Sequence, residues 1–385
     1  MTFAQAHAVG GDLDAAVRMA VAQLRKRLGE GPVDLVVAFA SAQHGEALDE
    51  LPERLHEALA PRTLVGCTGA RLLNGAVGAI DAPGLVVLAG RAPGARLDAV
   101  AIAPDELPDP DGPPSAWRAL LPARDTECAG MLVLGEPSHA DPRRLIAGLD
   151  FAFPGVPKVG GIASGSRRPH GHALFCGRRA HRSGTVVLAV GDGLAIEPVV
   201  ATGCRAFGRA GRITQSEGDR LIRVDATLAT DFVRDQIQEL GEDERAIVAT
   251  SPLLIGLDAD PFATSDAEPD WLVRTVRAID GRGHIVLGEH PQVGRQIRLL
   301  MRDTAAGADD AHRRLLRAKP AGASAALLFQ CLGRESDDCA AFHAASGGVP
   351  LIGFGCNGEI GPLAGQTELH AFSAAFAVLR ATEAR

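Results

Sequence analysis

The sequence predicts an α/β fold with two domains, in which mixed β-sheets are flanked by helices. Apolar runs of strand length alternate along the chain with segments whose apolar residues recur at helical spacing. A unit of strand, helix, strand, glycine turn and strand occurs three times. Such a strand–helix–strand crossover is typical of a parallel pair inside an α/β sheet. With 385 residues the chain is long enough for more than one core.

The first copy of this unit is preceded by an amphipathic helix over residues 12–28. Asp12 is the expected N-cap of that helix, and Gly29 is its expected end. The continuous apolar run after Asp34 predicts a strand buried on both faces. We expect the copy itself as a strand over 34–40, a polar turn and helix over 41–59, and strands over 63–69 and 85–89.

The second and third copies repeat this order. Their strands are expected over residues 131–134, 157–161 and 185–190, and over 326–329, 350–356 and 372–379. The first strand and the glycine lie 29, 27 and 25 residues apart in the three copies (Val37 to Gly66, Val133 to Gly160, Leu328 to Gly353). Because the copies are unevenly separated along the chain, they indicate duplicated parts of one larger fold and not a solenoid.

Different material lies between the second and third copies. We expect a strand over 197–207, a hairpin over 213–224, a helix over 227–240, a loop-rich stretch over 253–270, strands over 271–279, 284–287 and 296–301, and a helix over 309–316. The proline-rich residues 100–115 predict a surface connector.

Composition excludes several classes of protein. The net charge of −8 argues against a dedicated nucleic-acid binder, which needs a basic surface. No apolar run reaches the length that spans a bilayer, and no charged-then-apolar leader opens the sequence. The 7 cysteines are an odd number, scattered along the chain, which favours reduced thiols over a disulfide scaffold. We therefore expect a cytoplasmic protein without membrane or nucleic-acid partners.

The glycine turns are the expected binding site, because ligands of α/β sheets bind beyond the carboxyl ends of the strands. Backbone N–H groups in such turns can hold a carboxylate or phosphate, although plain structural turns stay open as the alternative. An arginine in an apolar strand, such as Arg205 or Arg274, could clamp a carboxylate. The candidate ligand-binding residues are Gly66, Cys67, Thr68, Gly160, Gly161, Arg205, Arg274, Cys356, Asn357 and Glu359.

Three other kinds of chemistry are weaker hypotheses. Cys67 or Cys356 as a nucleophile would need a nearby base, and spacing alone supplies none. His170, His172 and Cys176 would share one face of a strand and could approach a metal ion, but the surrounding residues favour a loop. The Gly-x-Gly-x-x-Gly pattern from Gly353 lacks the following helix that a dinucleotide site needs. We therefore predict no cofactor, no metal and no catalytic residue, with an enzyme as the alternative.

Several short segments also carry a family resemblance. They are Asp34–Ser41 as an opening strand, Val65–Gly69 and Val159–Gly165 as glycine turns, Trp271–Arg274, and Gly353–Pro362 followed by Leu369–Phe372. Through them the chain resembles the FIST family (F-box and intracellular signal transduction proteins) over nearly its whole length. The resemblance implies a FIST N-terminal domain over residues 1–230 and a FIST C-domain over 231–385. In some members the domain is fused to an F-box or a signalling output, and we expect this chain to depart from them as a stand-alone protein without either.

The resemblance further implies a sensory module of signal transduction that binds a small ligand such as an amino acid. The leading hypothesis is a cytoplasmic sensor whose ligand lies at the glycine turns between the two domains. Arg205 or Arg274 would take a carboxylate, and Asn357 or Glu359 would take an amine. Such a protein would need a signalling partner protein for its output, and homo-oligomerisation is open. The alternatives are an enzyme with a cysteine nucleophile or metal site, and a scaffold without a small ligand.

Overall fold

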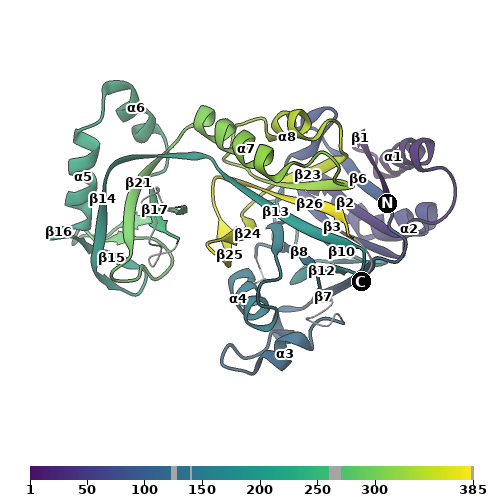
Figure 1. The fold of residues 1–385 in the computed structure, drawn as a ribbon, viewed down its shortest axis with the longest axis horizontal. Helices are drawn as coiled ribbons and strands as arrows, with labels where there is room; N and C mark the ends of the chain where they lie inside the picture. The colour runs from purple at the N-terminus through teal and green to yellow at the C-terminus, as the bar shows by residue number, and fades with distance from the viewer. Residues whose placement is uncertain (123–127, 139–140, 260–269, 383–385) are drawn as a thin grey trace. The chain divides into compact units, whose positions relative to one another are not determined.

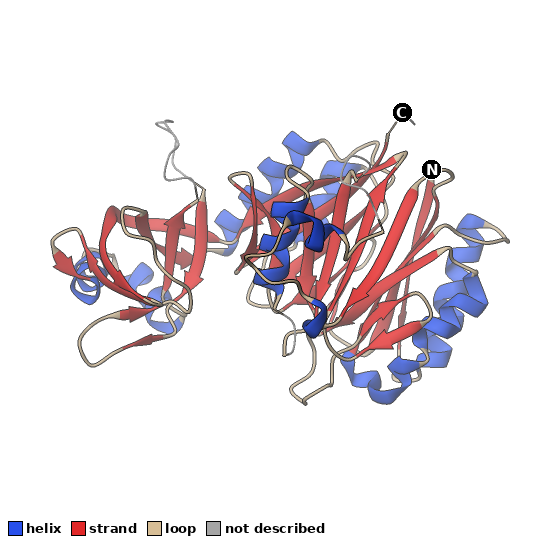
Figure 2. Ribbon diagram, turned by 90° about the horizontal axis from the view of Figure 1, so that it is seen from below, coloured by secondary structure: helices blue, strands red, loops and turns tan. Residues whose placement is uncertain are grey.

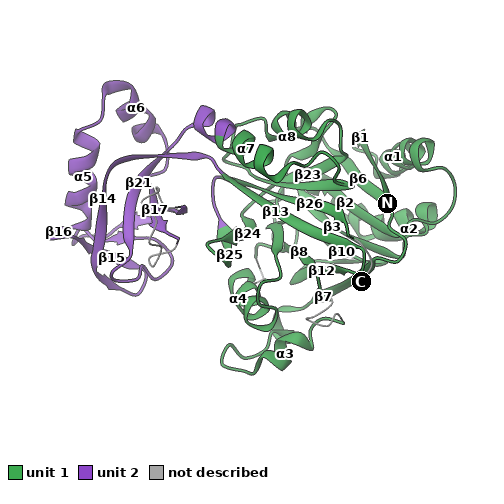
Figure 3. Ribbon diagram, viewed as in Figure 1, with its two compact units in different colours: residues 1–201, 310–369, 373–385 green, residues 202–309, 370–372 purple. Residues whose placement is uncertain are grey.

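The computed structural model describes residues 1–122, 128–138, 141–259 and 270–382 (Figure 1). The chain forms two compact units (Figure 3). Unit 1 comprises residues 1–201, 310–369 and 373–385, and unit 2 comprises residues 202–309 and 370–372. This grouping differs from a single division at residue 230, because the middle of the chain folds as one body while both flanks share the other.

Unit 1 contains three six-stranded sheets that share one strand order. The first sheet runs β1 (Thr2–Val9), β6 (Gly84–Arg91), β2 (Leu35–Ser41), β3 (Thr63–Gly69), β10 (Leu174–Cys176) and β11 (Arg179–His181). The second runs β7 (Arg96–Ile102), β12 (Thr185–Gly191), β8 (Gly130–Gly135), β9 (Lys158–Ile162), β24 (Glu359–Leu363) and β25 (Gln366–His370). The third runs β13 (Leu194–Thr202), β26 (Ser373–Ala381), β22 (Ala325–Cys331), β23 (Leu351–Cys356), β4 (Leu72–Asn74) and β5 (Gly78–Ile80).

Each sheet is completed by a hairpin that belongs to another copy of the repeated unit. The hairpin β10–β11 follows β9 in the chain but pairs with β3, β4–β5 follows β3 but pairs with β23, and β24–β25 follows β23 but pairs with β9. The exchange therefore closes into a cycle of three. Within each sheet the two central strands are parallel (β2–β3, β8–β9 and β22–β23). The third strand of the repeated unit (β6, β12 or β26) runs antiparallel to the first of those two. The α/β fold and the three-fold repetition predicted from the sequence are confirmed.

The three sheets share one apolar core, and their other faces are covered by helices (Figure 2). In the shared core the rings of Phe39, Phe329 and Phe354 lie 4.8–6.1 Å apart between centroids. The covering helices are α1 (Leu13–Leu28) and α2 (Leu51–Leu59) on the first sheet, α3 (Pro114–Arg118) and α4 (Pro142–Ala152) on the second, and α7 (Thr304–Ala318) and α8 (Asp338–Ser346) on the third. The Asp12 carboxylate accepts hydrogen bonds from Asp14 N and Ala15 N, so it caps α1 as expected. Two short 3₁₀ helices, η1 (Ala42–Asp49) and η2 (Pro104–Glu106), lie in connections.

Unit 2 is inserted into the third copy, between β13 and β22. Its eight strands are β14 (Cys204–Glu217), β15 (Arg220–Val224), β16 (Thr227–Leu228), β17 (Leu254–Asp258), β18 (Trp271–Thr275), β19 (Ala278–Ile279), β20 (Ile285–Val286) and β21 (Gln296–Arg302). Helices α5 (Ala229–Gln238) and α6 (Glu242–Thr250) accompany them. The hairpin expected over 213–224 is present as β14–β15. The stretch expected as loop contains the buried strand β17, and its residues 260–269 lie outside the described residues.

No helix in the described ranges combines the length and the apolar character needed to cross a membrane.

A glycine stands at the same position of the second strand in each copy, where the parallel neighbour approaches very closely. A Cβ atom on Gly66, Gly160 or Gly353 would lie 1.9, 1.8 or 2.0 Å from a carbonyl oxygen of the adjacent strand. These oxygens belong to Ala38, Val133 and Leu328, the residues paired in register with the glycines. The glycines are therefore required inside the strands by contact with backbone and not by a turn.

This contact predicts a steric penalty at all three positions. We expect Gly160→Ala to lower the free energy of unfolding by about 3 kcal/mol, because the backbone carbonyl cannot move aside as a flexible side chain could. Gly11→Ala is the matched control, since a Cβ there meets nothing within 4 Å. Urea unfolding of both variants checks this, and equal stabilities would contradict it.

Candidate functional site

The three glycine turns predicted as a site lie together inside unit 1. Ser164, which follows β9, donates its backbone N–H to Thr68 O at 3.1 Å and its hydroxyl to Gly355 O. Its Oγ also accepts the N–H of Ala70 at 2.8 Å. One serine side chain therefore joins the ends of β3, β9 and β23.

The third turn is tied to the second in the same way. The backbone N of Asn357 donates to Ile162 O at 3.0 Å, and its side-chain amide donates to Ala163 O at 2.8 Å. Gly358 O accepts the N–H of Ile162 at 2.9 Å. The Gly-x-Gly-x-x-Gly segment continues directly as strand β24. It therefore does not lead into the helix N-terminus that binds the pyrophosphate in a dinucleotide site.

Most of the predicted turn residues are buried. Of the predicted residues at these turns, Asn357 is exposed, whereas the others, Gly66, Cys67, Thr68, Gly160, Gly161, Cys356 and Glu359, are buried. Burial raises the pKa of the Cys67 and Cys356 thiols well above its usual value. Since a nucleophilic cysteine acts as the thiolate, this environment disfavours both residues for covalent catalysis.

Glu359 is a fully buried carboxyl at the start of β24. Its Oε2 accepts hydrogen bonds from the Ser373 hydroxyl at 2.7 Å and the Ser373 backbone N at 3.2 Å. Its Oε1 accepts from Cys356 Sγ at 3.3 Å. Burial raises the pKa of Glu359 to about 7, and the hydrogen bonds from Ser373 and Cys356 oppose that rise. Glu359 therefore binds the first residue of β26 and changes charge near neutral pH.

The two predicted arginine clamps lie in unit 2 and are paired with acids there. Arg205 contacts Glu244 at 2.8 Å and Asp303 at 3.0 Å. Arg274 is buried, and its Nε lies 2.5 Å from Glu289 Oε2. Both guanidinium groups are thus neutralised by residues of their own unit.

A cleft of about 700 Å³ opens beside the buried turns in unit 1. Its walls are η1, which directly follows β2, and the loop between β9 and β10, with Arg182 completing the lining. Gly165 connects the cleft to the turns, because a Cβ on it would meet Gly69 O at 3.0 Å. That loop has eleven residues (163–173), whereas the corresponding connections, 70–71 and 357–358, have two each. We name this feature the strand-end cleft.

The strand-end cleft carries charges of both signs. Arg182 is held by Asp49, with N–O distances of 2.6 and 3.0 Å. Arg167 and Arg168 on the loop and Glu46 on η1 are exposed, and none of the three makes an ion pair with another described residue. These three side chains are therefore available to a ligand.

A buried histidine and carboxylate lie under the loop. His172 Nδ1 is 3.5 Å from Glu136 Oε1, and both side chains are almost completely buried. His172 Nε2 accepts the backbone N–H of Ser166 at 3.3 Å. In the described part of the chain no three His, Cys, Asp or Glu side chains gather in a way that could hold a metal ion.

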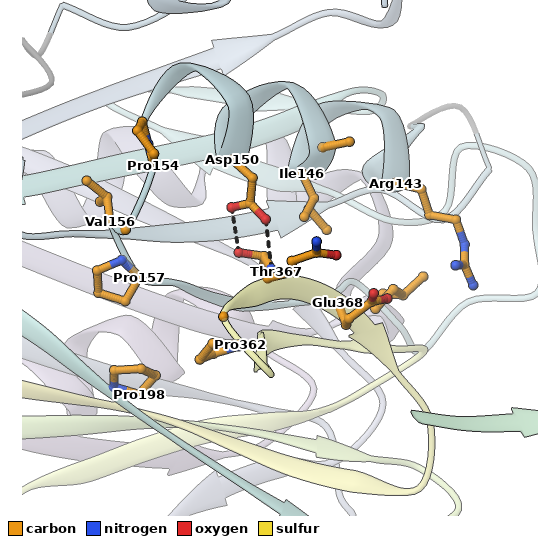
Figure 4. A pocket seen from close by; sticks show the side chains of 15 residues that line it. Arg143, Ile146, Asp150, Pro154, Val156, Pro157, Pro198, Pro362, Thr367 and Glu368 are labelled. Atoms are coloured by element: carbon orange, nitrogen blue, oxygen red, sulfur yellow. Dashed lines mark hydrogen bonds between the residues drawn. The ribbon is translucent and has the colours of Figure 1, made fainter. Parts of the chain in front are cut away.

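A second cavity, of about 670 Å³, lies between α4 and the hairpin β24–β25 (Figure 4). Asp150 points toward Thr367 and accepts its backbone N–H at 2.7 Å and its hydroxyl at 2.8 Å. Lys158, which is fully buried, contacts Asp150 at 2.8 Å and donates to the carbonyls of Phe153 and Val156. These polar groups attach the exchanged hairpin to α4, so they serve the fold.

The sequence pattern did not indicate Arg167, Arg168, Glu46 or Glu136, and it indicated His172 only as a candidate metal ligand with His170 and Cys176. The polar turn after the first strand and the glycine turn before Ser166 were its nearest signals. The eleven-residue loop 163–173 brings these residues together, and the sequence pattern does not show that this loop lies beside η1.

The raised pKa of Glu359 predicts a pH-dependent stability. Between the ordinary value near pH 4.5 and about pH 7, the folded state retains a proton that the unfolded chain releases. The free energy of unfolding should therefore fall as pH rises through this window. Relative to Glu359→Gln, wild type should lose at least about 1 kcal/mol more between pH 5 and pH 8.

Urea unfolding of both proteins at the two pH values measures this difference. Glu57→Gln is the control, because Glu57 is exposed. The same pH profile in wild type and Glu359→Gln would contradict the prediction.

Comparison with known proteins gives relatives along almost the whole chain. A protein of Mycobacterium bovis named only as uncharacterized is 30% identical over 374 residues, covering 93% of this chain and 94% of the relative. An uncharacterized protein of Mycobacterium tuberculosis is 28% identical over 381 residues, covering 95% and 96%. Two solved structures of cyanuric acid hydrolase, one from A. caulinodans, cover 99% of each chain at 12% and 9% identity, with TM-scores of 0.33 and 0.37. Such scores are too low to indicate a shared activity.

Family comparison matches the FIST N domain over residues 34–227 and the FIST C domain over residues 229–362. FIST domains are associated with sensors of signal transduction. The two matches together cover most of the chain, as the resemblance in the sequence implied. The chain therefore belongs to the FIST family.

Proposed function

We propose that this protein is a cytoplasmic sensor that binds a small zwitterionic metabolite of the amino-acid class in the strand-end cleft. One observation carries the proposal: the cleft presents Arg167 and Arg168 from its loop and Glu46 from η1, all without ion pairs to described residues. FIST domains are associated with signal transduction, so in this proposal ligand binding is the signal. A partner protein detects the bound state.

The arginines suit a carboxylate. A guanidinium group presents paired N–H donors that match the two oxygens of a carboxylate, and such charge-assisted bonds are among the strongest in proteins. Arg167 and Arg168 are adjacent in the loop, and Arg182 adds a third cation that Asp49 already neutralises. A ligand carboxylate would therefore gain two cations that no described acid competes for.

Glu46 suits an ammonium group. It is exposed on η1 and lines the same cleft as the arginines. A ligand with only a carboxylate would leave Glu46 near its own negative charge, which costs binding energy. The arrangement thus favours a molecule that carries both charges.

The ligand is placed in the cleft and not on the glycine turns. Backbone groups of those turns form hydrogen bonds across the strand ends, with Ser164 and Asn357 as partners. The proposed role of the turns is to fix the position of the loop that lines the cleft.

Ligand class can be tested by thermal shift with matched compounds. The panel contains glycine, L-alanine, L-leucine, L-glutamate and L-arginine, each with its hydroxy-acid and amine counterpart. A ligand at 100 times its Kd stabilises the folded state by about 2.7 kcal/mol, which raises Tm by a few degrees in a protein of this size. We expect one amino acid to shift Tm while its two counterparts do not, and a flat panel would contradict the proposal.

The residues can be tested by calorimetric titration with the selected amino acid. Arg167→Ala combined with Arg168→Ala should weaken binding at least about tenfold, since a hydrogen bond to a charged group contributes about 1.5–3 kcal/mol. Glu46→Gln should remove the preference for the amino acid over its hydroxy acid. Arg178→Ala is the matched control, because exposed Arg178 pairs with Glu53 outside the cleft. Unchanged affinity in the double variant would remove the ligand from this cleft.

A further inference from the structure

The loop that carries Arg167 and Arg168 is anchored firmly at its two ends. At one end the Ala163 N–H donates to Gly135 O at 2.8 Å. At the other end Ala173 pairs with Thr68, whose backbone N–H donates to Ala173 O at 2.9 Å. Between these points the loop is exposed from Arg167 to His170. The position of the two arginines therefore depends on contacts between these points, including Arg168 N with Ser166 Oγ at 3.0 Å and Arg182 Nη1 with His170 O at 3.5 Å.

His172 provides a contact from inside the protein to the middle of the loop. Its Nε2 accepts the Ser166 N–H at 3.3 Å, one residue before Arg167. A ring nitrogen that accepts a hydrogen bond carries no proton, so the proton of the neutral ring is on Nδ1. Nδ1 faces Glu136 Oε1 at 3.5 Å, and the other Glu136 oxygen accepts the Ser138 N–H at 3.0 Å. The carboxylate of Glu136 thus lies on the side of the ring where the neutral tautomer that accepts from Ser166 carries its proton.

We propose that Glu136 and His172 are a positioning pair that holds the ligand loop at neutral pH and releases it on acidification. The proposal rests on the proposed function, because release of the loop displaces the arginines assigned to the ligand carboxylate. Protonation of His172 places a hydrogen on Nε2, so that two donors face each other where one hydrogen bond existed. The Ser166 N–H then has no acceptor there, and the loop separates from the ring.

The charges around His172 set the pH range of this change. Burial lowers the pKa of His172, and Glu136 opposes this from the inner side. On the solvent side, Arg182 lies against the backbone of His172, with 3.5 Å between its Nη1 and His172 O, and Asp49 of η1 neutralises that guanidinium. Arg167, Arg168 and His170 are the other titratable groups on the loop side, and Glu46 lines the opposite wall of the cleft. The ring is therefore neutral at pH 7 and takes up its proton below the ordinary histidine value of about 6.5.

Hydrogen exchange of segment 164–171 tests the pair without any ligand. After correction for the intrinsic pH dependence of exchange, wild-type protection should fall at least about fivefold from about pH 7.5 to about pH 5.5. His172→Gln retains a neutral acceptor of similar reach, so its protection should not change with pH. Glu136→Gln removes the carboxylate that favours the protonated ring, so its midpoint should move to lower pH. His170→Gln, in the same loop, should keep the wild-type midpoint.

Two results would overturn the proposal: wild-type protection that does not change with pH, or the same pH profile in His172→Gln. A merely structural role would lower protection in the variants at every pH without moving the midpoint. If Glu136→Gln does not fold, the wild-type profile and His172→Gln decide.

A second measurement separates this proposal from the proposed function. The affinity of the amino acid selected in the thermal-shift panel should fall on acidification in wild type and stay constant in His172→Gln. A pH-dependent loop together with a flat panel would retain the positioning pair and reject the amino-acid sensor.

Discussion

Close backbone contact between two parallel strands, repeated in three copies, is the constraint on which unit 1 depends. Because Gly66, Gly160 and Gly353 lack a Cβ, each second strand lies directly against the carbonyl of its neighbour. The chain then leaves this strand and adds a hairpin to the sheet of another copy. No copy can complete its six-stranded sheet alone, and all three contribute to one apolar core. We therefore expect the three copies to fold as a single cooperative body, although unit 2 interrupts the third in sequence.

The same constraint explains why the buried turns form hydrogen bonds with one another. Strands that end against one another bury their backbone polar groups, and buried N–H and C=O groups must find partners. Ser164 and Asn357 supply those partners across the strand ends. At the place predicted by the strand-end rule these groups bond to one another, and Asn357 is the exposed residue among the predicted turn residues. Our proposal therefore assigns the ligand to the cleft, where the chain extends beyond this network.

Whether an element could be predicted from the sequence depends on the residue pattern that its environment requires. The central strands were predictable because continuous apolar runs mark strands buried on both faces, as in Leu35–Ser41. The position of each glycine turn at a strand end was predictable, but the meeting of the three turns inside one unit was not, because β3, β9 and β23 belong to three different sheets. The exchanged hairpins were not, because strands of three residues such as Leu72–Asn74 show no period and their partners lie far along the chain. The alternating, alanine-rich strand Thr2–Val9 was missed because its interior residues, from Phe3 to Ala8, include no β-branched side chain.

The three copies also show how one position acquires different chemistry. Ser41, Glu136 and Cys331 each stand three residues after the residue paired with the strand glycine. Ser41 Oγ accepts the Gly84 N–H at 3.1 Å and completes a purely structural contact. Cys331 lies beside the buried Glu359, and Glu136 faces His172. In this copy the connection after β9, the parallel neighbour of β8, has eleven residues and lines a cleft, whereas the corresponding connections after β3 and β23 have two residues each. The threefold framework does not require the nine extra residues, and functional groups concentrate on loops held by a rigid scaffold, so the second copy is the one to which we assign the proposed ligand site.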